Sequence, residues 1–292
     1  MIPRDVLSHL RYLEIYTSRK FRTLRVGDFT SQLHGSGVEF DRHRPYQVGD
    51  DVRSIDWSVT ARMGAPYIRE NQSERELNVV LVLDQSASMN LEAGEHSKRE
   101  VVTYVSGALL FSALADQINC GMLSFNEGVL EYHPPRQRRK AGAWRLLEEM
   151  WAHRSQGTTR IGAAVGFLNL NLRKPSLIFL ISDFLTGEDL RENALRQLAV
   201  RHDVILVIVE AVAERMLSKG AGFFRVRDME TGHRVIVQLS EKGRLEYAEL
   251  MRARRRELQN LCYELGMDHV VLRAEAGYLD PLLNLFALRK RR

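Results

Sequence analysis

The stretch that most constrains the fold is an apolar run, Val79 to Leu83, that ends abruptly at polar residues. Asp84, Ser86 and Ser88 follow this run at alternate positions. A short run rich in β-branched residues that stops in this way predicts a buried strand of a parallel sheet. Ligands of open α/β sheets bind outside the carboxyl ends of such strands. One carboxylate and two hydroxyls are therefore expected at a ligand-binding edge, and these hard oxygen groups suit Mg²⁺ or Mn²⁺ rather than zinc.

From residue 77 onward, apolar runs alternate with helical patterns. We predict strands at 78–83, 120–125, 177–182, 204–209 and 269–273, and a hairpin arm at 129–133. We predict helices near 98–116, 143–152, 189–200, 241–265 and 280–288, and one more after the turn at 157–159. Strands separated by helices indicate an α/β fold, a mostly parallel sheet with helices on both faces. A hairpin at about 223–239, with a glycine at its turn, interrupts this order.

Residues 1–76 differ from the rest of the chain. Val6, Leu10 and Leu13 predict an amphipathic helix, and the text after it is rich in Gly, Asp and Arg with short β-like pieces at 38–40, 55–57 and 67–68. We interpret 1–76 as an N-terminal helix and a small β-rich subdomain wrapped against the sheet domain at 77–288. The subdomain also carries a dense set of charges, which is either a second functional surface or a set of ion pairs and turn hydrogen bonds that tie it to the sheet. The set comprises Arg44, Asp50, Asp51, Arg53, Asp56 and Arg62, with Tyr46 and Trp57 expected to pack among them.

Composition excludes several classes of protein. The longest apolar runs have about half a dozen residues, whereas a membrane span needs about 20. The N-terminus lacks the apolar core of a signal peptide, so a cytoplasmic location is expected. Two cysteines, Cys120 and Cys262, do not make a disulfide framework, and neither is expected to be reactive.

The formal net charge is +5, and the basic residues are clustered at Arg136–Lys140, Arg252–Arg256 and Arg289–Arg292. Such clusters can meet nucleic acid, anionic lipid or an acidic partner. They can also be ordinary solvated helix faces, and no aromatic residues lie among them to stack on bases.

Two further segments add polar groups to the site predicted after the first strand. Residues 157–164 read Gly-Thr-Thr-Arg-Ile-Gly-Ala-Ala, which is a glycine turn, hydroxyl groups and then a helix. A second buried strand, Ile178 to Ser182, ends at Asp183. On its own, the Asp84-x-Ser86-x-Ser88 pattern could merely cap a helix, because Ser and Asp do so commonly. The order of the three segments favours a metal site instead.

This order resembles the metal-ion-dependent adhesion site (MIDAS) of the von Willebrand factor A family over about residues 77–275. The family's T-x-I-G-x-A pattern places Thr159, rather than Thr158, at the metal-linked threonine. The resemblance implies that Ser86, Ser88 and Thr159 contact the metal, with Asp84 and Asp183 acting directly or through water. The implied ion is Mg²⁺, with Mn²⁺ or Ca²⁺ as alternatives. The family's usual glycine after the last Asp is Phe184 here, a departure that removes no ligand.

Motifs in the N-terminal part of the chain, and one later motif, indicate a resemblance to a more specific family. The motifs at 35–40, 44–57, 60–62 and 228–232 resemble the signature of domain-of-unknown-function family 58, which spans nearly the whole chain. Relatives in that family are often encoded beside MoxR-type AAA+ ATPases. The resemblance therefore implies a chaperone-like or assembly role with such an ATPase or its client as a partner.

Three functions stay open at this point. In von Willebrand factor A domains a partner protein supplies a carboxylate to the ion, which favours a metal-dependent protein-interaction module without enzymatic activity. Two carboxylates around Mg²⁺ could instead activate water for phosphoester hydrolysis. However, a haloacid-dehalogenase-like phosphatase needs an Asp where Ser86 stands, and the sequence has no P-loop and no H-E-x-x-H motif. Binding of nucleic acid or an anionic surface through the basic clusters is the third possibility.

Overall fold

The computed structural model describes residues 2–20, 39–47, 49–72, 77–93, 96–188, 190, 193–217 and 222–289. The chain divides into two compact units, one of residues 30–76 and the other of residues 1–29 with 77–292. Residues 35–38 of the motif at 35–40, and residues 290–292 of the basic cluster at Arg289–Arg292, lie outside the described residues.

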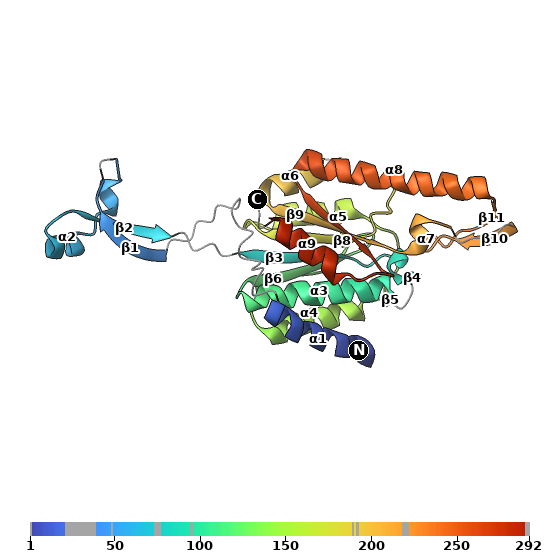
Figure 1. The fold of residues 1–292 in the computed structure, drawn as a ribbon, viewed down its shortest axis with the longest axis horizontal. Coiled ribbons are helices and arrows are strands. Elements are labelled where there is room, and N and C mark those ends of the chain that lie inside the picture. Colours follow the sequence, from blue (N-terminus) through green and yellow to red (C-terminus); the bar gives the residue numbers. More distant parts are fainter. Residues whose placement is uncertain are drawn as a thin grey trace. The chain divides into compact units, whose positions relative to one another are not determined.

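The larger unit is built on a six-stranded sheet in the order β12-β9-β8-β3-β6-β7 (Figure 1). Every neighbouring pair is parallel except β6 and β7, which form an antiparallel hairpin. The predicted α/β fold is therefore confirmed, and it is the von Willebrand factor A-like arrangement that the resemblance implied. The strands are β3 (Asn78–Asp84), β6 (Asn119–Phe125), β7 (Val129–Gln137), β8 (Leu177–Ser182), β9 (Asp203–Glu210) and β12 (Asp268–Arg273).

The strand order has a switch point at β3. The chain leaves β3 for β6 on one side and later returns to β8 on the other, so β3 lies between them. Ligands of open α/β sheets bind in the crevice at such a point, outside the carboxyl ends of the strands. Asp84 at the end of β3 and Asp183 just after β8 therefore belong to the same crevice.

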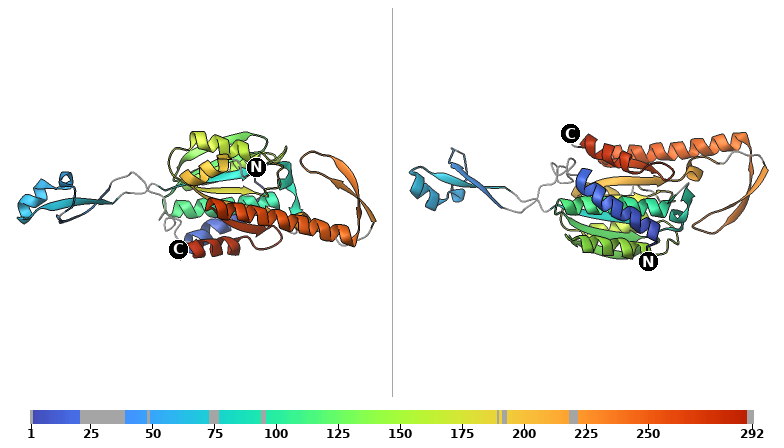
Figure 2. Two further views of the ribbon diagram at one scale, coloured as in Figure 1. Left: turned by 90° about the horizontal axis from the view of Figure 1, so that it is seen from above. Right: turned by 60° about the horizontal axis from the view of Figure 1, so that its bottom comes forward.

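Helices cover both faces of the sheet (Figures 1 and 2). On one face, Val80 and Val82 of β3 share a buried cluster with residues of α5, α6 and α8. On the other face lies α3, against which α1 and α4 pack, and Phe286 of α9 meets Phe179 of β8. These helices are α1 (Arg4–Lys20), α3 (Lys98–Ala115), α4 (Lys140–Ala152), α5 (Ile161–Asn171), α6 (Asn193–Arg201), α8 (Glu241–Leu265) and α9 (Leu279–Arg289).

Burial of β3 on both faces explains its unbroken apolar sequence. All seven residues of β3 are buried. Full burial of one such side chain is worth roughly 1.5–3 kcal/mol, so the strand anchors the polar loop that follows it.

Both cysteines are also buried and free. Burial raises the pKa of Cys120 to about 12, which agrees with the prediction that it is unreactive.

Helix α1 belongs to the sheet unit, which differs from the predicted boundary at residue 76. Val6, Leu10 and Leu13 are fully buried, and α1 packs against α3. The two helices approach closely at Gly107, where an added Cβ would lie 2.6 Å from Leu10 Cδ2. The amphipathic pattern was read correctly, but the helix and the following segment belong to different units.

The hairpin interrupting the α/β order is present, with β10 (Gly222–Arg227) antiparallel to β11 (Arg234–Leu239). All of its strand residues are exposed except Leu239. The short helix α7 (Val212–Arg215) precedes it, and α8 follows it directly. Figure 1 shows the hairpin beside α7, at the end of the sheet where the predicted site lies.

The smaller unit contains an antiparallel pair, β1 (Glu39–Pro45) and β2 (Tyr67–Gln72). A helix, α2 (Trp57–Met63), begins where sequence predicted a β-like piece at 55–57, because Asp56 caps it by accepting hydrogen bonds from two backbone amides. Trp57 is 68% exposed, so the prediction that it packs among the charged residues of this unit is wrong. Arg44 and Asp50 form a two-bonded ion pair within this unit at 2.8 Å for each bond.

Among the described residues, no helix combines the length and apolarity that crossing a bilayer requires.

Candidate metal centre

The site begins where β3 ends. Asp84 is 1% exposed, and its Oδ1 accepts a hydrogen bond from the backbone amide of Ser86 at 2.8 Å. This bond turns the chain sharply, and a short 3₁₀ segment, Ala87–Asn90, follows. The turn leaves the hydroxyl oxygens of Ser86 and Ser88 3.1 Å apart. The alternation seen in the sequence therefore becomes a cluster of oxygen atoms at the carboxyl end of β3.

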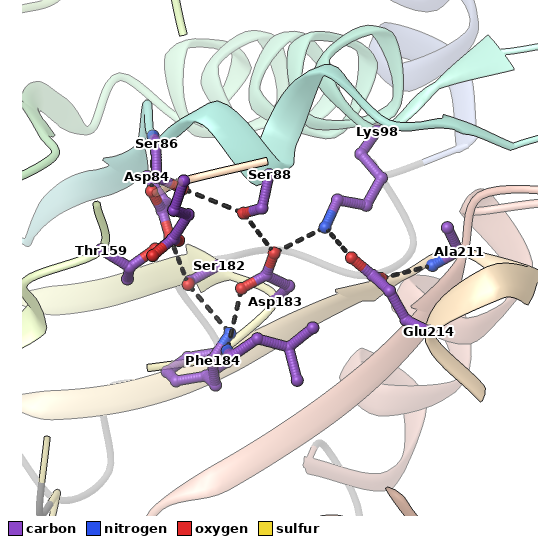
Figure 3. A network of polar contacts seen from close by, with 12 residues as sticks. Asp84, Ser86, Ser88, Lys98, Thr159, Ser182, Asp183, Phe184, Ala211 and Glu214 are labelled. Atoms are coloured by element: carbon purple, nitrogen blue, oxygen red, sulfur yellow. Dashed lines mark hydrogen bonds and ion pairs between the residues drawn. The ribbon is translucent and has the colours of Figure 1, made fainter. Parts of the chain in front are cut away.

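The structure brings all five predicted residues together (Figure 3). Ser88 Oγ donates a hydrogen bond to Asp183 Oδ2 at 2.6 Å, which joins the β3 loop to the end of β8. Thr159 Oγ1 lies 3.4 Å from Asp84 Oδ2. Asp84, Ser86, Ser88, Thr159 and Asp183 thus form one connected polar network drawn from three separate segments.

Thr159 occupies its place because the loop before α5 is tied to the β3 loop. The backbone amide of Ala87 donates to the carbonyl of Gly157 at 3.0 Å, and that of Gln156 donates to the carbonyl of Gln85 at 2.9 Å. Gly157 has a φ of +75°, a backbone conformation that favours glycine. Thr159 is 4% exposed, which agrees with the sequence alignment that places Thr159 rather than Thr158 in the site.

Ser182 is a member of the network that sequence reasoning missed. Its Oγ donates to Asp84 Oδ2 at 2.6 Å and accepts a hydrogen bond from the backbone amide of Phe184 at 3.0 Å. A serine directly before the strand-terminal Asp183 was the available signal, since a polar residue there is unusual in a buried strand.

Lys98 was also missed, and it changes the electrostatics of the site. Its side chain is 0% exposed, and its Nζ donates to Asp183 Oδ2 at 2.6 Å and to Glu214 Oε1 at 2.5 Å. Glu214 lies on α7 and also accepts a hydrogen bond from the backbone amide of Ala211 at 2.8 Å. Lys98 and Glu214 are 116 residues apart, so no local pattern in the sequence joins them.

A further carboxylate comes from the hairpin. Glu230 lies at the turn between β10 and β11, and its Oε1 accepts a hydrogen bond from Thr159 Oγ1 at 2.7 Å. The motif at 228–232 was noted in the sequence, but only as a family signature, and its contact with Thr159 depends on how the hairpin folds back.

The ionisation of the two central carboxyls differs. Burial, and then the negative charge of Asp183, raise the pKa of Asp84 to about 6. Burial opposes ionisation of Asp183 as well, but the Lys98 ammonium outweighs it and the pKa of Asp183 is lowered. Of these two carboxyls, Asp183 has the Lys98 ammonium as a partner in the described network and Asp84 has no cationic partner there.

The network fits a divalent cation. In the part of the chain that the structure describes, it joins four carboxyl groups, Asp84, Asp183, Glu214 and Glu230, to one ammonium, Lys98. A surplus of buried negative charge is costly unless a cation compensates it. The side-chain atoms around Asp84 that could bind a cation are carboxyl and hydroxyl oxygens, which are the ligands that Mg²⁺, Mn²⁺ and Ca²⁺ take.

Phe184 stands where the resemblance to the von Willebrand factor A family implies a glycine. Its φ is +56°, in the left-handed region where side chains are disfavoured, yet its ring is only 4% exposed. Burial of this apolar side chain contributes favourable free energy that acts against the cost of the backbone conformation.

A cavity of about 530 Å³ lies beside the site, between the ends of β8 and β9 and one side of α8. Asp183 and Glu214 line it on the site side, and Arg254 and Arg255 line it from α8. Both arginines are engaged: Arg254 donates to the carbonyls of Phe184 and Thr186, and Arg255 pairs with Glu210.

A cluster of histidines and carboxylates lies on β7 and α4. His133 Nε2 lies 2.9 Å from carboxylate oxygens of both Glu131 and Glu149, and His153 Nε2 lies 2.7 Å from the other oxygen of Glu131. These contacts are separate from the network around Asp84.

The sequence of residues 42–257 matches the family model described as "Protein of unknown function DUF58". This range is more than half of the chain. The chain belongs to the DUF58 family. The DUF58 match includes all five predicted metal-site residues, and it also includes Glu230 and Lys98. It runs through parts of both compact units.

Relatives of the DUF58 chain occur among curated proteins. It is 28% identical over 284 residues to the uncharacterized protein Mb1516 of Mycobacterium bovis and, to the same extent, to the uncharacterized protein Rv1480 of Mycobacterium tuberculosis. The alignments cover 97% of this chain and 89% of each relative.

Two solved structures are similar in part. The conserved hypothetical protein BatB from Bacteroides thetaiotaomicron matches 74% of this chain and 100% of its own, with a TM-score of 0.47 and 18% identity. Proximal thread matrix protein 1 from the mussel byssus, in a structure described as having a zinc-occupied MIDAS motif, matches 47% of this chain and 39% of its own, with a TM-score of 0.34 and 15% identity.

Proposed function

We propose that this DUF58 protein is a metal-dependent protein-interaction module. A divalent ion, Mg²⁺ in the first instance, would be held by Asp84, Ser86, Ser88, Thr159 and Asp183, and a partner protein would bring a carboxylate to it. The observation that carries the proposal is the hydrogen-bonded closure of these five side chains at the switch point of the sheet.

The donor set suits binding. Mg²⁺ takes six oxygen ligands and usually keeps several waters, so a site with few charged ligands retains exchangeable positions. When bound, the ion supplies a positive centre that a carboxylate can reach. The chain's own residues orient this centre: Ser182 and the Ser86 amide hold Asp84, and Lys98 holds Asp183.

The partner is proposed from the family. The resemblance to DUF58 proteins encoded beside MoxR-type AAA+ ATPases favours such an ATPase, or one of its clients, as the source of the carboxylate. Assembly or chaperone-like work would then depend on the metal.

Two observations weigh against the other candidate functions. A haloacid-dehalogenase-like hydrolase needs an aspartate where Ser86 stands, and the sequence has no P-loop and no H-E-x-x-H motif. In the basic cluster at Arg252–Arg256, Arg252 and Arg256 pair with Glu249 on the helix surface, which lowers the net positive charge that this cluster offers to nucleic acid. Arg254 and Arg255 are bonded within the fold, as described above.

Isothermal titration with Mg²⁺ tests the metal site. The wild type is expected to bind one ion and Asp84→Asn to lose binding, because the substitution removes the charge and keeps the shape. Glu246→Gln, on an exposed position of α8, is the matched control and should bind like the wild type. A wild type that is folded by circular dichroism but binds no divalent ion would contradict the proposal.

Pull-down with a MoxR-type ATPase tests the partner. Recovery should require Mg²⁺ and be lost both with EDTA and in Asp84→Asn. Equal recovery under all conditions would reject metal-gated binding. Phosphoester hydrolysis that disappears in Asp84→Ala would favour the hydrolase instead.

A further inference from the structure

The turn of the β10–β11 hairpin has a fixed local geometry. The carboxylate of Asp228 accepts hydrogen bonds from the backbone amides of Glu230 and Thr231, at 2.8 and 3.0 Å. The amide of Gly232 donates to the carbonyl of Asp228 at 3.0 Å, and Gly232 has a φ of +73°. These contacts are satisfied within the turn itself. They leave the side chain of Glu230 available to point away from the hairpin.

Glu230 reaches the predicted metal centre. Its Oε1 lies 2.7 Å from the hydroxyl oxygen of Thr159, the same hydroxyl that lies 3.4 Å from Asp84 Oδ2. Glu230 is half-buried, whereas Met229 and Thr231 beside it are exposed. The side chain is therefore inserted against the body of the protein, while its neighbours in the turn face solvent.

This placement is costly without a cation. Asp84 and Asp183 are already two buried carboxyls in close proximity, and a third carboxylate beside them adds like-charge repulsion. A divalent ion between these groups would reverse the sign of the interaction.

The hairpin is also weakly held by apolar contacts. From Gly222 to Gln238 its strand residues are exposed, including Phe223 at 76% and Ile236 at 66%. Segments with few buried apolar contacts open at low free-energy cost. The hairpin can therefore leave the body without disturbing the sheet.

We propose that Glu230 is a metal ligand supplied by the chain itself, which closes the site until a partner's carboxylate displaces it. This inference rests on the proposed metal site and adds its regulation. Because the hairpin is tethered, its carboxylate competes at an effective concentration in the millimolar range. A partner must therefore bring additional contacts if its carboxylate is to displace Glu230 from the ion.

The experiment compares the wild type with Glu230→Gln, which keeps the shape of the side chain and its ability to accept a hydrogen bond from Thr159 but removes the charge. Glu246→Gln is the control for loss of one surface carboxylate. Mg²⁺ affinity is measured by titration calorimetry, and exchange of the amides at 222–239 is measured by hydrogen–deuterium exchange with and without Mg²⁺. Circular dichroism establishes that each variant is folded.

The expected results are specific. Glu230→Gln should bind Mg²⁺ about tenfold more weakly, because it lacks one coordinating charge. A tenfold change in affinity corresponds to about 1.4 kcal/mol. Mg²⁺ should slow exchange of the hairpin amides in the wild type and in Glu246→Gln but not in Glu230→Gln. Either an unchanged affinity or an unchanged Mg²⁺-dependent protection in Glu230→Gln overturns the inference.

The two proposals fail separately. If the wild type binds Mg²⁺, Asp84→Asn does not, and Glu230→Gln behaves like the wild type, the metal site stands and the internal ligand is wrong. If the wild type binds no divalent ion, both are wrong.

Discussion

Lys98 is the residue on which the charge balance of the site depends. It is fully buried and lies between Asp183 and Glu214, so it neutralises carboxylates that the fold has removed from water. Burial opposes its ionisation, but both carboxylates outweigh this effect and its pKa is raised. The ammonium therefore stays charged across the physiological range.

Lys98→Met should destabilise the protein by about 3–5 kcal/mol, because removing one partner of a buried ion pair leaves the others uncompensated. Urea unfolding followed by circular dichroism measures this. Lys242→Met, at an exposed position of α8, should change stability by less than about 0.5 kcal/mol. Similar small effects for both substitutions would show that the buried network is not what the geometry indicates.

Asp84 predicts a pH dependence of metal binding. Its folded pKa of about 6 lies above its ordinary value of 3.8. In the metal-free protein this shift adds stability below the ordinary value, which is lost as pH rises from about 4 to 6. Metal binding has the opposite dependence, because a divalent ion needs the ionised carboxylate.

Mg²⁺ affinity should therefore be weaker at pH 5 than at pH 7.5, and calorimetry at both values measures the difference. In buffers of different ionisation enthalpy, the titration near pH 6 should also reveal proton release. Equal affinity at the two pH values would mean that Asp84 does not ligate the ion.

At the scale of elements, helices and strands were predicted well where the sequence carries apolar periodicity together with residues that start or end the element. Helix α8 was expected at 241–265 and spans Glu241–Leu265, because Ser240 caps its start and Gly266, in the left-handed conformation, ends it. Helix α2 was missed because its start depends on the Asp56 cap in a segment with no apolar periodicity.

The residues of the site likewise fall into a group that local sequence signals predicted and a group that they did not. The predictable site residues lie at or just after the end of a strand, or just before a helix, in a pattern that resembles a MIDAS. They are Asp84, Ser86, Ser88, Thr159 and Asp183. Lys98, Glu214 and Glu230 were not predictable, because their roles arise only when α3, α7 and the hairpin meet in space.

The contact between α1 and α3 gives a prediction at this scale. Gly107→Ala would place a Cβ 2.6 Å from Leu10 Cδ2, so the buried Leu10 side chain or α1 itself must shift. Overpacking of this kind costs about 1–3 kcal/mol. Gly166→Ala in α5 has open space around the new methyl group and should stabilise the protein by about 0.5–1 kcal/mol.

Denaturant unfolding of the two glycine variants should therefore give shifts of opposite sign. Equal shifts would show that α1 does not pack on α3 as tightly as the structure places it.

At the scale of the whole molecule, the sequence alone placed the boundaries between the sheet unit and the unit of residues 30–76 only approximately. The change in composition after the first helix was visible, but an amphipathic helix does not indicate which neighbour covers its apolar face. The DUF58 match at 42–257 runs across both units, so the family is defined by more than the metal centre.

The engagement of Arg254 with the carbonyls of Phe184 and Thr186 has a mechanical consequence. Helix α8 has 25 residues and begins directly after the hairpin, so it is a stiff rod roughly 37 Å long at 1.5 Å per residue. The N-terminal end of α8 is joined to β11, the strand that follows Glu230. Arg254, in the middle of α8, is hydrogen-bonded to the loop that follows Asp183. A force applied to the hairpin therefore reaches the site by two routes, directly through Glu230 and along the rod to the backbone next to Asp183.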